Sequence, residues 1–141
     1  MIRPMQRPLP SKRVIGIDIT LGRFAAHVQM FATLGREHRS SYVCCVNPQM
    51  AVEAWKDKDF AAVVNHADLS TADGMPILRS LQLFHCVKQE RMAENDIMPA
   101  LMADAERQGL SIYLYGGKQE VLDAITARAA KDHPRLRVAG A

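Results

Sequence analysis

The feature that most constrains the fold is the alternation of short, strand-like segments with longer amphipathic segments. The strands are expected at 13–19, 41–47, 67–70, 110–115 and 136–141. Helices are expected at 24–35, from Pro48 to about 64, at 74–84, from Asn95 or Asp96 to 108, and between Gly117 and Pro134. This repeated order predicts an α/β fold, with a mainly parallel, Rossmann-like sheet flanked by helices.

Apolar residues at helical spacing define the face that each helix is expected to bury. For the second helix these residues are Val52, Trp55 and the segment 60–64. For the third helix they are Ile77, Leu78, Leu81 and Phe84. Gly35 is expected to stop the first helix.

The chain has 141 residues, which is typical of one domain, placed here at 13–141. Residues 1–12 are predicted to be a flexible basic tail, because prolines interrupt them and no apolar run follows. No apolar segment is long enough for a membrane span. The net charge of +3 is not gathered into a Lys/Arg stripe with interleaved aromatics, so no nucleic-acid partner is expected.

Metal binding and disulfide formation find little support in the sequence. The three cysteines include an adjacent pair and no CxxC spacing, and the five histidines have no ligand spacing. The acidic "DKD" at Asp57–Asp59 resembles a metal-binding DxD, but a solvated helix face is the favoured interpretation. No metal or cofactor is therefore expected, and the cysteines are interpreted as free thiols in a reducing cytosol.

Polar residues or glycines follow three of the expected strands. They are Asn47, the pair Asp73–Gly74, and the pair Gly116–Gly117. Ligands of parallel α/β sheets bind at the carboxyl ends of the strands. These positions are therefore the candidate site.

Asp73 has two interpretations. Its carboxylate can accept a proton from an attacking hydroxyl group, as a general base does. It can instead cap the helix that begins near Met75, and the residues by themselves favour this cap. Asp68 is interpreted as a polar residue at the entrance of a strand.

The segment "YLYGGKQEV" also has two interpretations, which the residues alone leave equal. Gly116 and Gly117 permit a tight turn and a close approach to a ligand. The following helix N-terminus and Lys118 would favour a phosphate group. The alternative is a tight strand–helix turn that binds nothing.

Asn47 and Cys45 lie two residues apart and so face the same side of a strand. Asn47 can hydrogen-bond a sugar or a phosphate, or it can cap the helix that starts at Pro48. Cys45 can line the same site, or it can be a small buried residue.

Four ordered segments, "VNPQM", "ADLSTADGMPI", "ERMAENDIMPAL" and "IYLYGGKQEV", together resemble the WecG/TagA/CpsF family of bacterial glycosyltransferases. The resemblance extends over about residues 14–141. It implies inverting transfer of N-acetylmannosamine, its uronate or a hexose from a UDP donor to a polyprenyl-diphosphate-linked acceptor in surface polysaccharide synthesis. It also implies a cytoplasmic protein at the inner face of the membrane.

The resemblance implies roles for individual residues. Asp73 corresponds to the family's catalytic base, and Gly74 completes the same Asp-Gly step. Asn47 lines the pocket, while Arg91 and Asp96 match the arginine and the acid of the family's "R-x-x-G-x-D" segment. Gly116 and Gly117, with Lys118 beside them, lie near the nucleotide.

The chain departs from the family pattern at three places. Cys45 replaces a usual threonine, and Glu94 replaces a usual glycine. Family members also continue for about another hundred residues, so an incomplete fold is expected, with self-association or a complementing C-terminal fragment as partners. An inactive nucleotide-sugar-binding or assembly remnant is thus the second hypothesis. An unrelated α/β binding module would require the four segments to be coincidental.

Overall fold

The computed structural model describes residues 9–38 and 40–141. Contacts divide the described chain into two compact units: residues 9–27 and 40–96 form the first, and residues 28–38 and 97–141 form the second. Of the predicted flexible tail, residues 1–8 lie outside the described residues. Ser11 and Lys12, which the sequence places in that tail, belong instead to the first strand, β1 (Ser11–Val14).

A β-hairpin replaces the single strand expected at 13–19. β1 pairs antiparallel with β2 (Ile17–Thr20) through a turn in which Ile15 and Gly16 both have positive φ, 48° and 81°. Such two-residue turns match the twist of paired strands. Asn65 supports the turn from outside, because its side chain accepts from the Asp18 N–H and donates to the Gly16 carbonyl, both at 2.9 Å. The single-strand prediction is wrong because this support comes from a distant residue.

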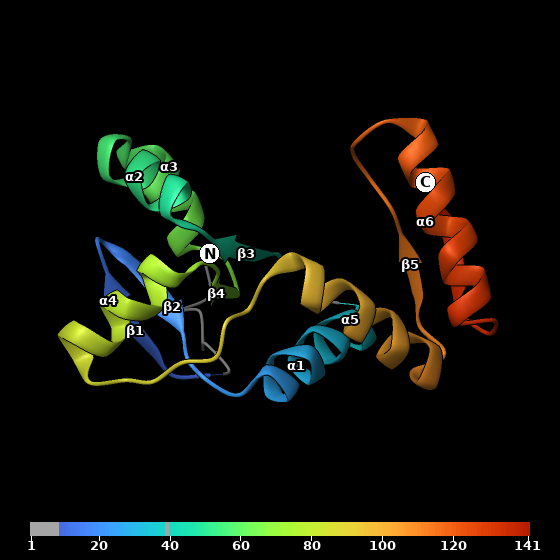
Figure 1. Ribbon diagram of the computed structural model, residues 1–141, viewed down its shortest axis with the longest axis horizontal. Helices are drawn as coiled ribbons and strands as arrows, with labels where there is room; N and C mark the ends of the chain where they lie inside the picture. The colour runs from blue at the N-terminus through green and yellow to red at the C-terminus, as the bar shows by residue number, and fades with distance from the viewer. Residues whose placement is uncertain (1–8, 39) are drawn as a thin grey trace. The chain divides into compact units, whose positions relative to one another are not determined.

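The parallel pair of the first unit consists of β3 (Val43–Val46) and β4 (Leu69–Ala72). Two helices, α2 (Pro48–Lys56) and α3 (Lys58–Asn65), connect these strands (Figure 1). The Asp57 side chain accepts from the Asp59 and Phe60 N–H groups, so it ends one helix and caps the next. The hairpin meets β4 where the buried Thr20 hydroxyl accepts from the Ser70 N–H at 2.9 Å.

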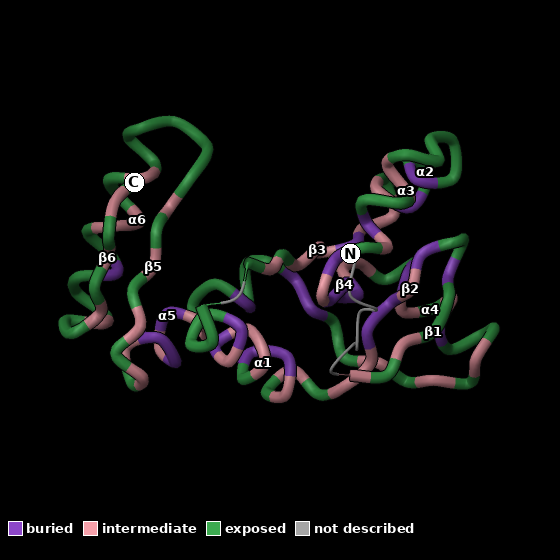
Figure 2. Tube along the Cα trace, turned by 180° about the vertical axis from the view of Figure 1, so that it is seen from behind, coloured by how far each residue is buried: buried purple, intermediate pink, exposed green. Residues whose placement is uncertain are grey.

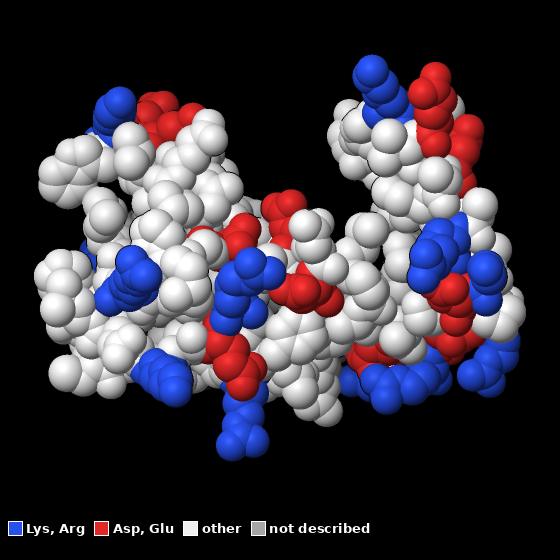
Figure 3. All heavy atoms as spheres, viewed as in Figure 1, with Lys and Arg blue, Asp and Glu red and all other residues white. Residues whose placement is uncertain are grey.

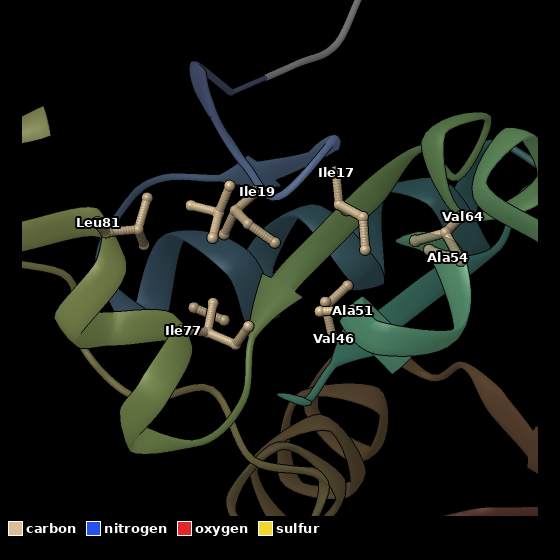
Figure 4. Close-up of a cluster of buried hydrophobic side chains, with 10 residues drawn as sticks. Ile17, Ile19, Val46, Ala51, Ala54, Val64, Ile77 and Leu81 are labelled. Atoms are coloured by element: carbon tan, nitrogen blue, oxygen red, sulfur yellow. The ribbon is translucent and has the colours of Figure 1, made fainter. Parts of the chain in front are cut away.

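The core of the first unit gathers side chains from the hairpin, β3, β4 and three helices (Figure 4). Ile17, Ile19 and Leu81 are fully buried there. Leu81 and Ile77 come from α4 (Met75–His85), as expected. Phe84, however, is 70% exposed, so its assignment to the buried face is wrong.

The buried face of α2 also differs from the expected one. Val52 and Trp55 are exposed, while Ala51 and Ala54 are buried. Spacing identifies the correct helix but not the correct face here, because small alanine side chains let the helix approach the sheet closely. Figure 2 shows how buried and exposed positions alternate along α2.

The second unit contains most of α1 (Phe24–Arg36) and α5 (Glu94–Gln108), together with β5 (Ser111–Tyr113), α6 (Gln119–Asp132) and β6 (Arg137–Gly140). β5 and β6 pair in parallel. Gly35 lies inside α1 and not at its end, and α5 begins one residue before the expected caps. Within the described residues, the chain is therefore an α/β protein of Rossmann-like type with two parallel strand pairs and one antiparallel pair.

Basic and acidic side chains are interspersed on the face seen in Figure 3. Among the described residues, no helix is both long and apolar enough to cross a membrane.

Candidate functional site

Two polar side chains meet at the carboxyl edge of the β3–β4 pair. The register pairs Val46 with Ala72, so Asn47 and Asp73 each follow the last residue of neighbouring strands. The Asp73 N–H donates to the Val46 carbonyl at 2.9 Å, which extends the pairing by one step. Asn47, Asp73 and Gly74 thus follow the carboxyl ends of β3 and β4, as expected, and their part in a binding site stays a prediction.

The Asp73 carboxylate does not cap a helix. Gly74 occupies the N-cap position of α4, and no side chain of a described residue caps that helix. The cap interpretation of Asp73 is therefore wrong. Asp73 is half-buried, and its carboxylate has no hydrogen bond or ion pair with any other described residue. A carboxylate held by the backbone but free at its oxygens can accept a proton from a bound ligand.

The backbone conformation at position 74 explains why a glycine follows Asp73 at this edge. Gly74 has a φ of 91°, a conformation that favours glycine, and a Cβ atom there would lie 3.1 Å from Pro48 Cδ. Pro48 begins α2 and Met75 begins α4. A side chain at this position would therefore press on the start of α2.

Asn47 is the N-cap of α2, and its Oδ1 accepts from the Met50 N–H at 2.9 Å. The capping interpretation is therefore confirmed. The cap engages only the oxygen of the side chain, while an amide group also carries two N–H donors. A ligand-binding role for these donors stays a prediction.

The segment before α5 also reaches this edge. The Met92 N–H donates to the Ala72 carbonyl at 2.9 Å, and the buried Thr71 hydroxyl donates to the Met92 carbonyl at 3.4 Å. These bonds hold the start of α5, with Glu94 as its first residue, beside the end of β4. Arg91 forms an ion pair with Asp96, Nη2 to Oδ2, at 3.0 Å. The arginine and the acid that match the family's "R-x-x-G-x-D" segment thus bind each other.

Cys45 lies opposite Thr71 in the strand register and is half-buried. Burial raises the pKa of the Cys45 thiol, a side-chain hydrogen bond with Thr71 lowers it, and the charges of Glu94 and Asp73 raise it again. Because the net shift is upward, the thiol stays protonated at neutral pH and is a poor nucleophile. Two carboxylates, those of Glu94 and Asp73, are thus among the causes of this upward shift.

Thr71 is a residue of this edge that the sequence alone does not single out. It is fully buried and contacts both Cys45 and the segment before α5. The available signal is its position two residues before Asp73, on the same side of β4. A buried threonine in a short strand is, however, also common as a core residue.

Gly116, Gly117 and Lys118 belong to the second unit, where they link β5 to α6. Both glycines have positive φ, 101° and 83°, with open space around the position of a Cβ atom. Lys118 is the N-cap residue of α6, and its side chain makes no capping bond. The tight turn is therefore confirmed, and the phosphate-binding role stays a prediction.

The acidic "DKD" is part of a helix boundary. Asp57 is used to cap α3, and all three of its residues are exposed. Within residues 9–38 and 40–141, no group of three or more His, Cys, Asp or Glu side chains could hold a metal ion. Asp68 lies at the opposite end of β4 from Asp73, where its Oδ2 accepts from the Tyr42 N–H at 3.1 Å.

Comparison with known proteins identifies relatives of this chain. A family model described as "Glycosyl transferase WecG/TagA/CpsF family" matches residues 12–141. An N-acetylglucosaminyldiphosphoundecaprenol N-acetyl-beta-D-mannosaminyltransferase of Bacillus subtilis is 28% identical over 98 residues, which are 70% of this chain and 38% of the relative. A protein of the same name from Bacillus spizizenii is 24% identical over 131 residues, 93% of this chain and 50% of the relative. The chain thus spans half or less of the length of these relatives.

Proposed function

The chain belongs to the WecG/TagA/CpsF family of glycosyltransferases, and on this basis we propose that it transfers a sugar from a UDP donor to a lipid-linked acceptor. The two relatives are named for transfer of N-acetylmannosamine to a diphosphoundecaprenol-linked sugar. We propose the same class of reaction here, with N-acetylmannosamine, its uronate or a hexose as the transferred sugar. The reaction takes place at the cytoplasmic face of the membrane, in surface polysaccharide synthesis.

The observation that carries this proposal is the position of the Asp73 carboxylate and its lack of a structural role. The carboxylate lies at the carboxyl edge of a parallel strand pair and is neither a helix cap nor part of an ion pair among the described residues. In the proposed reaction, Asp73 takes the proton of the acceptor hydroxyl while that oxygen bonds to the anomeric carbon of the donor. The bond from this carbon to the diphosphate breaks, UDP leaves with the electron pair, and the anomeric configuration inverts.

The leaving diphosphate needs stabilisation as its negative charge develops. We propose that the turn at Gly116, Gly117 and Lys118 binds a diphosphate group through its backbone N–H groups and one positive charge. Cys45, Asn47 and Gly74 line the sugar side of the site in this account. The Arg91–Asp96 pair stiffens the start of α5 beside it.

A second candidate function is a nucleotide-sugar-binding or assembly protein without transferase activity. It is favoured by the replacements at Cys45 and Glu94, because the chain carries a thiol and a carboxylate where the family pattern has threonine and glycine. Binding and catalysis are separable by experiment, so the two functions can be distinguished.

The test is a calorimetric titration of the chain with UDP and UDP-N-acetylmannosamine, with and without magnesium, followed by a transfer assay on a lipid-linked acceptor. We expect metal-independent binding and measurable transfer. Binding without transfer would favour the second function. A folded chain that binds neither ligand would contradict both the transferase function and a nucleotide-sugar-binding role.

A further inference from the structure

Glu94 brings a second carboxylate to the edge that holds Asp73. It is the first residue of α5, two residues after Met92, whose backbone is hydrogen-bonded to Ala72 at 2.9 Å and to Thr71 at 3.4 Å. Its position is therefore tied to the end of β4. The negative charges of Glu94 and Asp73 both raise the pKa of the thiol of Cys45, which lies opposite Thr71 of β4 in the strand register.

Among residues 9–38 and 40–141, no cation forms an ion pair with Glu94. Arg91, three residues before Glu94, pairs with Asp96 at 3.0 Å instead. In the part of the chain that the structure describes, neither Glu94 nor Asp73 forms an ion pair. Glu94 is exposed, so its carboxylate faces solvent or ligand and not the core. The edge therefore presents two negative charges to whatever binds there.

We propose that Glu94 is a specificity-determining residue, which selects against donor sugars that carry a carboxylate of their own. The inference rests on the proposed function and narrows its substrate class to uncharged hexoses and N-acetylhexosamines. A uronate sugar at this partly exposed edge would add a third negative charge to those of Asp73 and Glu94, and like charges repel. A neutral sugar avoids this repulsion and can donate its hydroxyl hydrogens to the carboxylates. Discrimination by repulsion is a common route to specificity.

The experiment compares UDP-N-acetylmannosamine with UDP-N-acetylmannosaminuronate, in binding by titration and in transfer by kcat/KM. The wild-type chain is expected to favour the neutral donor by roughly tenfold or more, which is the size of effect expected for one extra like charge at a partly exposed site. Glu94→Gln, which keeps the length of the side chain and removes the charge, should lower this preference by about tenfold. Glu94→Asp should retain most of it.

The controls separate charge from size and from global effects. Glu94→Gly removes both bulk and charge, so it should lower the preference for the neutral donor as Glu94→Gln does. If Glu94 acted through its size, Glu94→Gly would lower the preference and Glu94→Gln would not. Glu53→Gln makes the same charge change on the exposed surface of α2 and should leave the preference unchanged. Added salt should weaken the wild-type preference but not that of Glu94→Gln.

Two results would overturn the inference in different ways. Equal preference in the wild-type chain and Glu94→Gln would contradict the role of Glu94 while leaving the transferase function intact. Failure of every variant to bind either donor would remove the proposed function itself, and the specificity role with it.

Discussion

At the scale of single residues, Asp73 and Gly74 have different roles: Gly74 shapes the backbone, and Asp73 is the proposed catalytic base. Gly74 takes the N-cap position of α4 and the left-handed backbone, and it fits against Pro48. Asp73 therefore does not cap α4, although its sequence context favours that role. Asn47, at the equivalent end of the neighbouring strand, has the opposite assignment and caps α2.

Gly74→Ala is expected to lower the free energy of unfolding by about 2–3 kcal/mol, because the positive φ is strained for alanine and its Cβ would press on Pro48. Urea unfolding measures this loss. Gly109→Ala is the matched control, since Gly109 has a φ of 68° but open space around it. It should cost about 1 kcal/mol. Equal losses in the two variants would show that the contact with Pro48 contributes nothing.

At the scale of helices and strands, side chains at helix ends hold the elements in place. In the first unit, Asn65 at the end of α3 supports the β1–β2 turn. In the second unit, Glu106 of α5 accepts from the Arg135 N–H at 2.9 Å, just before β6. His133 and the Arg135 guanidinium lie 3.6 and 3.8 Å from the same carboxylate.

Glu106→Gln should lower the melting temperature at neutral pH. The backbone hydrogen bond from Arg135, aided by the Arg135 charge and by His133, lowers the pKa of Glu106 below its ordinary 4.5. A lowered pKa means that the carboxylate stabilises the fold above the ordinary value, and that this stabilisation is lost as the pH falls through the lowered value. The variant and the wild type should therefore converge in acid.

Melting curves of both proteins between neutral pH and pH 3 give the comparison, with Glu37→Gln, an exposed residue, as the control. A difference in melting temperature that persists unchanged into acid would show that Glu106 acts through packing and not through its charge.

At the scale of the whole molecule, most of the order of elements could be predicted from the sequence, because apolar spacing and the positions of Gly and Pro are local signals. The exceptions are the β1–β2 hairpin, expected as one strand, and α2 and α3, expected as one helix. The α/β class and the parallel β3–β4 pair follow from that order. The polar residues at the carboxyl edge also follow from it, since strand ends in parallel sheets converge. The N-cap at Asn47 could be predicted for the same reason, because an asparagine directly before a proline at the start of a helix is a local motif.

Features that depend on distant residues could not be predicted in the same way. The hairpin turn at Ile15–Gly16 relies on Asn65, and the burial of Ala51 in place of Val52 depends on how α2 meets the sheet. Asp73 does not cap α4 because Gly74 occupies the N-cap position. The placement of Glu94 beside β4 depends on hydrogen bonds to Met92. Each of these requires the folded chain.

The central claim is that Asp73 acts as the base of glycosyl transfer at the carboxyl edge of the β3–β4 pair. The most direct measurement is the transfer rate of Asp73→Asn against the wild-type chain on a lipid-linked acceptor, with donor binding measured in parallel. We predict a loss of about 10²–10⁴-fold in kcat with donor binding retained. Asp68→Asn, at the other end of β4, should transfer normally. Unchanged turnover in Asp73→Asn would contradict the account.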